Sequence, residues 1–158
     1  MTLLALTQYL RNLGYQAIAS ANDSALAVPL AIKAGLGEYG RLGLLITRRF
    51  GPRVRLGKIF TDLPLAHDTP IRFGVKAFCE GCQACVAGCP VKAIPAGPPG
   101  PPPAGPSYLR GVIKWTVDAE KCFGYWAQQN TDCAICIRVC PYNRDFTRWP
   151  ARLWRRLA

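Results

Sequence analysis

Apolar residues recur every three or four positions at the start of the chain, which is the spacing of an amphipathic helix. The recurring set is Leu3, Leu6, Leu10 and Leu13. This set predicts a helix over residues 3–13, which Gly14 can end. The short apolar run over residues 15–21 predicts a strand after it.

A second helix is expected next, because Asn22, Asp23 and Ser24 are turn and N-cap residues. It runs to about residue 34, with Pro29 near its start and Gly35 as its stop. Two strands are then predicted over residues 44–47 and 54–60. The Arg-Arg-Phe-Gly-Pro stretch between them is expected to form a turn.

Residues 35–40 read Gly-Leu-Gly-Glu-Tyr-Gly, the letters of a dinucleotide-binding fingerprint. That fingerprint requires a strand before it and a helix after it, whereas here a helix precedes and a strand follows. We therefore expect these glycines to allow tight turning, or close approach of the backbone to a flat ligand.

Residues 95–106 hold half of the chain's 14 prolines, so they cannot form a helix or a central strand. We expect an exposed, extended linker there. It is either a passive spacer or a proline-rich recognition ligand.

The chain has 158 residues, about one domain, and half of them are hydrophobic, which excludes a wholly disordered chain. Its longest apolar runs, such as residues 25–32, are far shorter than the ~20 residues of a membrane span. The first residues lack a basic start and a small-residue cleavage site. We therefore expect no secretory signal and a cytoplasmic location for the chain as written.

The net charge of +11 suits a nucleic-acid binder, but its distribution weakens that interpretation. Basic residues gather in residues 41–58 and in the tail, residues 138–156. The tail, with Trp149 and Trp154 among arginines, resembles a terminal helix with packed tryptophans more than a single-strand binder. We expect no nucleic-acid partner, and positive charge also suits an acidic electron donor.

Eight cysteines form two related motifs that carry the strongest chemical signal. The first motif is Cys79-x2-Cys82-x2-Cys85-x3-Cys89-Pro90, and the second is Cys122-x10-Cys133-x2-Cys136-x3-Cys140-Pro141. The first matches the bacterial ferredoxin run, in which the fourth cysteine binds the other of two 4Fe–4S clusters. The second keeps the last three positions of that run.

This crossing pattern predicts two sets of four ligands. The first set is Cys79, Cys82, Cys85 and Cys140, and the second set is Cys89, Cys122, Cys133 and Cys136. Disulfides or two structural zinc sites are the alternatives. Neither explains the doubled Cys-x2-Cys-x3-Cys-Pro sequence, so two 4Fe–4S clusters are preferred.

Two clusters need only about 60 residues, so the first 76 residues require another explanation, and several blocks supply one in order. They are LRNLGY at 10–15, Asn22-Asp23, AGLGE at 34–38, LLIT at 44–47, GPRVR at 51–55, FTDLPL at 60–65, Lys114-Trp115, KCFGYW at 121–126 and CAICIRVCP at 133–141. Together they resemble the C-terminal half of the corrinoid-dependent reductive dehalogenases.

The resemblance implies an α+β fold with three parts. A partial nitroreductase-like region over residues 1–76 would bind cobalamin and substrate. A dicluster ferredoxin-like 4Fe–4S module would follow over residues 77–145, with residues 95–106 as an insertion, and residues 146–158 would be a basic tail. Electrons would pass through two clusters to a corrinoid, which reductively removes halide from an organohalide.

The resemblance also implies roles for residues outside the cysteine motifs. Arg55 would be the cation beside the proton-donating tyrosine of the family, and Asn22 would line the substrate pocket. The alternatives are an ion pair of Arg55 with Glu38 or Asp62, and Asn22 as a helix cap. The expected corrinoid contacts are Gly35, Leu36, Gly37 and Thr47.

The family's proton-donor tyrosine lies upstream of the LRNLGY block, so the chain resembles a fragment or a shortened reading frame. Alone, it is expected to hold clusters without completing dehalogenation. The implied partners are an organohalide, an electron-donor protein or quinol chain, and a small membrane-anchor subunit. Longer relatives are exported and membrane-associated in some cases. The alternatives are an epoxyqueuosine reductase-like enzyme acting on tRNA, or a non-catalytic dicluster electron-transfer module.

Overall fold

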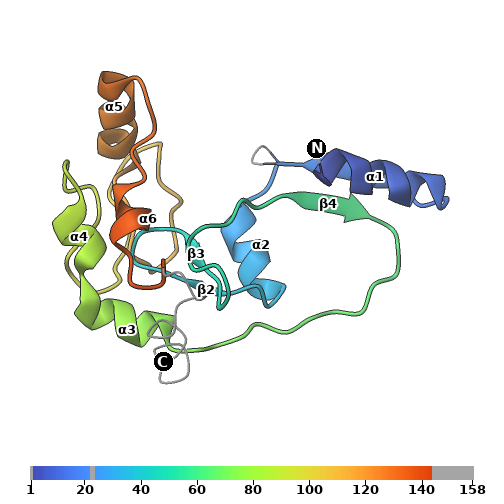
Figure 1. Cartoon of the computed structure of the whole chain (residues 1–158), viewed down its shortest axis with the longest axis horizontal. Helices are drawn as coiled ribbons and strands as arrows, with labels where there is room; N and C mark the ends of the chain where they lie inside the picture. The colour runs from blue at the N-terminus through green and yellow to red at the C-terminus, as the bar shows by residue number, and fades with distance from the viewer. Residues whose placement is uncertain (1, 22–23, 144–158) are drawn as a thin grey trace.

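The computed structural model describes residues 2–21 and 24–143. The strands and two helices lie within the first 61 residues, and the helices that follow carry five of the eight cysteines (Figure 1). The elements are α1 (Thr2–Asn12), β1 (Ala17–Ser20), α2 (Ala27–Lys33), β2 (Glu38–Tyr39), β3 (Leu45–Ile46), β4 (Lys58–Thr61), α3 (Val75–Cys82), α4 (Ala84–Gly88), α5 (Ala119–Gln129) and α6 (Ile135–Val139). The chain is therefore a small α+β protein, as expected.

The strands form two separate antiparallel pairs. β1 pairs with β4, with Ala17 opposite Thr61, and β2 pairs with β3, with Glu38 opposite Ile46. The strands on either side of the 48–52 turn are therefore not partners. The turn is closed locally by two hydrogen bonds of 3.0 Å between Thr47 and Gly51.

The strand expected over residues 54–60 was placed too early, because it begins only at Lys58. Residues 53–57 have no ladder partner and belong to no strand. β4 finds its partner in β1, far back in the sequence, and a hairpin pattern does not reveal that pairing.

α1 packs on β1 and β4, and this unit lies at the opposite side of the molecule from α3, α4, α5 and α6 (Figure 1). The helix is where its leucine spacing predicts it, but the leucine stripe is not covered. Leu10 is buried, whereas Leu6 and Leu13 are each about half exposed.

The hydrophobic core lies within the cysteine region. It joins β3 and the neighbouring turn to α3, α4 and the residues around the last cysteine. Its buried members are Leu42, Ile46, Val75, Cys79, Cys85, Ile94, Trp115, Cys140 and Tyr142. Three of the eight cysteines are thus part of the hydrophobic core, so the residues that stabilise the fold also surround the cysteine side chains.

The glycine-rich bend, residues 35–40, follows α2 and contains β2. A helix therefore precedes it and no helix follows it directly, unlike a dinucleotide-binding fingerprint. The glycines of this bend meet backbone from other parts of the chain. A Cβ on Gly35, where φ is +67°, would lie 2.6 Å from the carbonyl oxygen of Thr69. A Cβ on Gly37 would lie 2.1 Å from that of Ile46. Close internal packing therefore requires these two glycines.

The proline-rich segment, residues 95–106, contains no helix and no strand apart from an isolated bridge between Gly100 and Lys114, as expected. Most of it is exposed. At its beginning, the side chain of Arg41 donates hydrogen bonds to the carbonyls of Pro95 and Gly97. No helix in the described ranges has the length and apolarity to cross a membrane.

Candidate functional site

The two cysteine motifs fold into the same local structure. Gln83 and Ala134, one residue after the second cysteine of each run, have left-handed φ values of 47° and 51°. A five-residue helix follows each, α4 or α6, and then a cysteine in extended conformation, Cys89 or Cys140. The amide of that cysteine donates to the carbonyl three residues earlier at 3.3 Å in both cases.

The repeated unit explains how one run supplies two sites. The helix carries the third cysteine of the run, and the extended backbone after it directs the fourth away. α4 and α6 pack directly on each other, so each fourth cysteine reaches the neighbouring unit. Gly88 permits this contact, because a Cβ there would lie 3.1 Å from Cγ2 of Val139.

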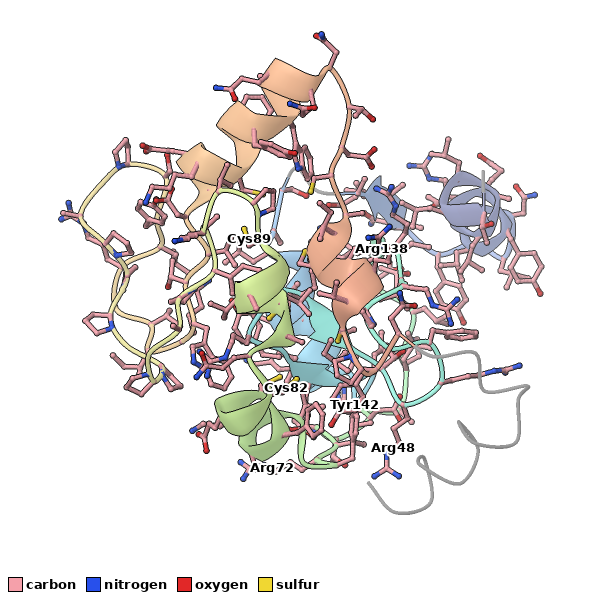
Figure 2. The ribbon with its side chains drawn as sticks, turned by 60° about the vertical axis from the view of Figure 1, so that its left-hand side comes forward. Arg48, Arg72, Cys82, Cys89, Arg138 and Tyr142 are labelled. Atoms are coloured by element: carbon pink, nitrogen blue, oxygen red, sulfur yellow. The ribbon has the colours of Figure 1, made fainter. Side chains whose placement is uncertain are left out.

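Four cysteines line one small cavity between α3, α4 and the end of α6. They are Cys79, Cys82, Cys85 and Cys140, the first set defined by the crossing pattern. Arg41, Phe78 and Tyr142 line the same cavity. Cys82 and Tyr142 both lie at the lower end of α4 in Figure 2, and Cys89 lies at its upper end.

The other four cysteines line a second cavity of about 700 Å³. They are Cys89, Cys122, Cys133 and Cys136, the second set. The walls of this cavity come from α5, α6, the segment that follows α4, and residues 42–44 and 52–55. The wall of this cavity is mostly apolar and includes Leu42, Val54 and Trp126. The structure thus brings together both predicted sets, each including a cysteine from the other motif.

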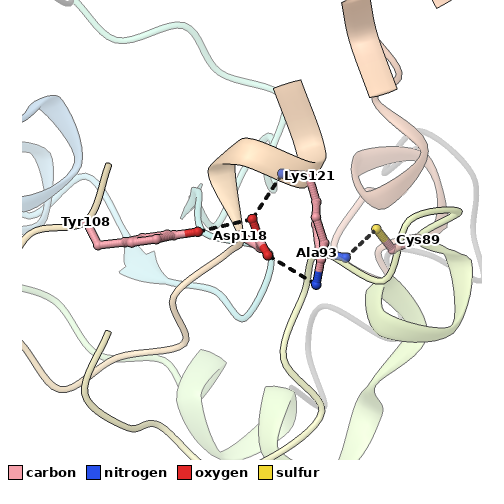
Figure 3. A network of polar contacts seen from close by, with 5 residues as sticks. All are labelled: Cys89, Ala93, Tyr108, Asp118 and Lys121. Atoms are coloured by element: carbon pink, nitrogen blue, oxygen red, sulfur yellow. Dashed lines mark hydrogen bonds and ion pairs between the residues drawn. The ribbon is translucent and has the colours of Figure 1, made fainter. Parts of the chain in front are cut away.

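A hydrogen-bond network links Cys89 to the start of α5, the helix that carries Cys122. Figure 3 shows its contacts between Ala93 and Cys89 and between Lys121 and Asp118. The amide of Ala93 donates to Sγ of Cys89 at 3.3 Å, and the carbonyl of Ala93 accepts from the amide of Asp118 at 2.7 Å. Asp118 is the N-cap of α5, accepting from the amide of Lys121 at 3.0 Å. α5 carries Cys122, so the cap positions it relative to Cys89.

Burial and mutual repulsion disfavour free thiolates in both cavities. Burial, then the nearby Cys79 and Cys140, raises the pKa of Cys85 to about 11. In the second set, burial, and then Cys89 and Cys133, raises the pKa of Cys122. Four sulfurs of this kind around one cavity favour a cationic occupant that compensates their charge, which fits an iron–sulfur core.

The alternatives to clusters receive no support from the geometry. All eight cysteines are free thiols in the structure. Across residues 2–21 and 24–143, no three His, Cys, Asp or Glu side chains are arranged to hold a single metal ion, as a zinc site would require.

The remaining candidate residues are placed less decisively. Arg55 is exposed and lines the second cavity together with Arg53. Asn22 lies outside the described residues. Neither cavity is lined by Gly35, Leu36, Gly37 or Thr47. Thr47 instead uses its hydroxyl within the turn, donating to the carbonyl of Gly51 and accepting from the amide of Phe50. The corrinoid-binding role of Gly35, Leu36, Gly37 and Thr47 stays a prediction.

Two residues at the first cavity were not anticipated from the sequence. Arg41 lies in a Gly-Arg-Leu-Gly turn whose composition is typical of an exposed loop, yet it is 2% exposed. Tyr142 follows the last Cys-Pro, and burial raises its pKa to about 12. Its position two residues after Cys140 is the sequence signal that could have identified it.

Comparisons with known proteins agree with this geometry. Residues 78–144 match the family described as a 4Fe-4S dicluster domain. The tetrachloroethene reductive dehalogenase of Sulfurospirillum multivorans is 44% identical over 139 residues, which are 88% of this chain and 28% of that protein. The epoxyqueuosine reductase of Aliivibrio fischeri is 34% identical over 141 residues, 78% of this chain and 32% of that protein.

A solved reductive dehalogenase, described as suggesting a mechanism for B12-dependent dehalogenation, superposes with a TM-score of 0.83 at 32% identity. The match covers 96% of this chain and 22% of that one. The chain therefore spans about a quarter of the length of the reductive dehalogenases it matches.

Proposed function

We infer that this chain, a homologue of part of the corrinoid-dependent reductive dehalogenases, is the electron-transfer part of such an enzyme and one wall of its corrinoid site. The observation that carries the inference is the sorting of eight cysteines into two cavities, each completed by the last cysteine of the other motif. Two bound 4Fe–4S clusters would supply one-electron transfer, and a corrinoid would supply the cobalt centre for reducing a carbon–halogen bond.

In this proposal the two sets of cysteines are the cluster ligands. The first set would hold its cluster within the hydrophobic core, where Cys79, Cys85 and Cys140 are all less than 10% exposed. The second set would hold its cluster against the larger cavity, and all four of its members are half-buried. The protein would exclude water from the first cluster and leave the second cluster accessible from the larger cavity.

The larger cavity supports a corrinoid or substrate beside the second cluster. Both clusters have the same size, yet the second cavity is far larger than the first. Its walls are mostly apolar, and the exposed Arg53 and Arg55 contribute positive charge. We assign Arg55 the role of the cation beside the proton-donating tyrosine, where its charge would stabilise the phenolate.

The remaining parts of the proposal follow the homology. Residues 1–76 would be a partial nitroreductase-like region that contacts the corrinoid through Gly35, Leu36, Gly37 and Thr47, with Asn22 near the substrate. Residues 77–145 would be the ferredoxin-like module, and residues 146–158 its basic tail. An organohalide would be the substrate of the whole enzyme. Its electron donor would be a protein or a quinol chain, with a small membrane-anchor subunit as a further partner.

Anaerobic reconstitution tests this proposal. The 158-residue chain is loaded with iron, sulfide and cobalamin, desalted, and its iron and cobalt are counted. We expect about eight irons per chain and cobalt in near-stoichiometric amount. Iron without cobalt would reduce the proposal to a dicluster electron-transfer module. Zinc in place of iron would overturn it.

A pair of arginine variants tests the wall of the larger cavity. Arg55→Ala should lower the cobalt retained while leaving the iron content unchanged, because Arg55 lines the cavity without contributing a cluster ligand. Arg49→Ala is the matched control, since Arg49 is exposed and its guanidinium lies over Phe50 instead. Equal cobalt in both variants would contradict the role assigned to Arg55.

A further inference from the structure

Arg41 is a buried cation beside the first cysteine set. It lies in the turn between β2 and β3, and its side chain is 2% exposed. It lines the cavity formed by the four cysteines of that set. Burying a guanidinium is costly unless its donors are satisfied, so its partners are informative.

The partners of Arg41 are carbonyl groups. Its Nε donates to the carbonyl of Cys79 at 2.9 Å, and one terminal nitrogen donates to that of Glu80 at 3.4 Å. The other terminal nitrogen donates to the carbonyls of Pro95 at 2.7 Å and Gly97 at 2.9 Å. The guanidinium carbon also lies 4.6 Å from the ring centroid of Trp115.

These bonds place a positive charge at the C-terminus of α3. This helix ends at Cys82, so the carbonyls of Cys79 and Glu80 are among the last four, which lack partners within the helix. A cation there satisfies them and complements the helix dipole. The turn that Arg41 fixes carries two of the four cysteines of the first set.

The charge of Arg41 is not neutralised by a carboxylate. Within residues 2–21 and 24–143 the one ion pair joins Lys121 to Asp118, so Arg41 has carbonyls and an aromatic ring as its neighbours. Carbonyl dipoles solvate the guanidinium but leave its net charge in place. In a buried, low-dielectric site such a charge acts more strongly than it would at the surface.

We propose that Arg41 is a positioning residue that raises the reduction potential of the cluster held by the first cysteine set. A cluster bound by four thiolates is anionic, and it gains one more negative charge when an electron is added. A fixed cation beside the cavity therefore stabilises the reduced state more than the oxidised state. The inference rests on the proposed binding of a cluster by this set.

Redox titration of the reconstituted chain, followed by electron paramagnetic resonance with dithionite as reductant, tests the proposal. Arg41→Gln should lower the reduction equilibrium constant of one cluster about tenfold, or about 59 mV for one electron. The second cluster is the internal control and should not shift. A Cys82→Ser variant identifies which signal belongs to the first cavity.

Arg41→Lys and Arg11→Gln complete the design. Lysine keeps the charge, so its cluster should keep a potential close to that of the wild type. Arg11→Gln removes the same charge, and a bond to a carbonyl, at the distant helix α1, so it should leave both potentials unchanged. If Arg41→Gln fails to take up the first cluster, an unshifted lysine variant still supports the proposal.

The proposal would be overturned if the potential of the first cluster did not shift in Arg41→Gln, or if it shifted equally in Arg11→Gln. It would also be overturned if Arg41→Lys lost that cluster, or if its reduction equilibrium constant fell about tenfold in that variant. Failure of the proposed function is distinct, because the wild-type chain itself would then take up no iron.

Discussion

Replacing Gly51 by alanine should disturb the first cysteine set through the backbone. Gly51 has a left-handed φ of +56°, and an added Cβ would lie 2.2 Å from the carbonyl oxygen of Tyr142 and 2.7 Å from its carbonyl carbon. Tyr142 lies two residues after Cys140, and both line the first cavity. A backbone carbonyl cannot swing aside as a flexible side chain does, so the displacement should reach Cys140.

Two costs contribute to the expected loss of stability. The left-handed conformation costs alanine about 1–2 kcal/mol. Relief of the contact with Tyr142 adds about 1–3 kcal/mol, the usual range for overpacking a core. We therefore expect the free energy of unfolding of the apo chain to fall by about 2–5 kcal/mol.

Gly111→Ala is the matched control, because Gly111 has a φ of +77° and open space where the Cβ would lie. It should lose only the conformational part, about 1–2 kcal/mol. Urea unfolding of the apo chains under reducing conditions measures both values. After reconstitution, Gly51→Ala should retain about four irons and Gly111→Ala about eight. Equal stability losses with full iron in both variants would refute this reasoning.

Two other changes give separate tests. Gly37→Ala should lower the stability of the cofactor-free chain by about 1–3 kcal/mol through contact with the carbonyl of Ile46; unchanged apo stability with reduced cobalt uptake would mean that a ligand sets this glycine instead. The hydrogen bond from the amide of Lys121 lowers the pKa of Asp118 below its usual 3.8. The charged form therefore stabilises the fold above the unfolded-state pKa, and this contribution disappears as pH falls through the folded-state pKa. Asp118→Asn should accordingly flatten the fall of melting temperature below about pH 4, and identical acid profiles would contradict that.

The cysteine grouping could be predicted from the sequence because its cause is local. A left-handed residue, one helical turn and an extended Cys-Pro fit within a few residues, and the same unit occurs twice. The crossing was predicted because this spacing matches the bacterial ferredoxin run, in which the fourth cysteine binds the other cluster. α1 and β1 were also predictable, since their periodicity is confined to short segments.

The pairing of β4 with β1 and the burial of Arg41 were not predictable in this way. Ala17 and Thr61 are strand partners although α2 and the glycine-rich bend lie between them in the sequence. No turn sequence connects the two strands directly, so no local pattern predicts their pairing. Arg41 is buried because the end of α3 and the start of the proline-rich segment both present free carbonyls to it. Such an environment exists only after distant segments have come together.

An iron count on paired cysteine variants tests the exchanged ligand sets most directly. Cys79 and Cys140 line the first cavity, whereas Cys136 lines the second. The double variant Cys79→Ala with Cys140→Ala should therefore lose one cluster and keep about four irons. Cys136→Ala with Cys140→Ala, two changes within one sequence motif, should lose both clusters. The reverse result, with about four irons kept by the second pair and none by the first, would show that each motif binds its own cluster and would contradict the account.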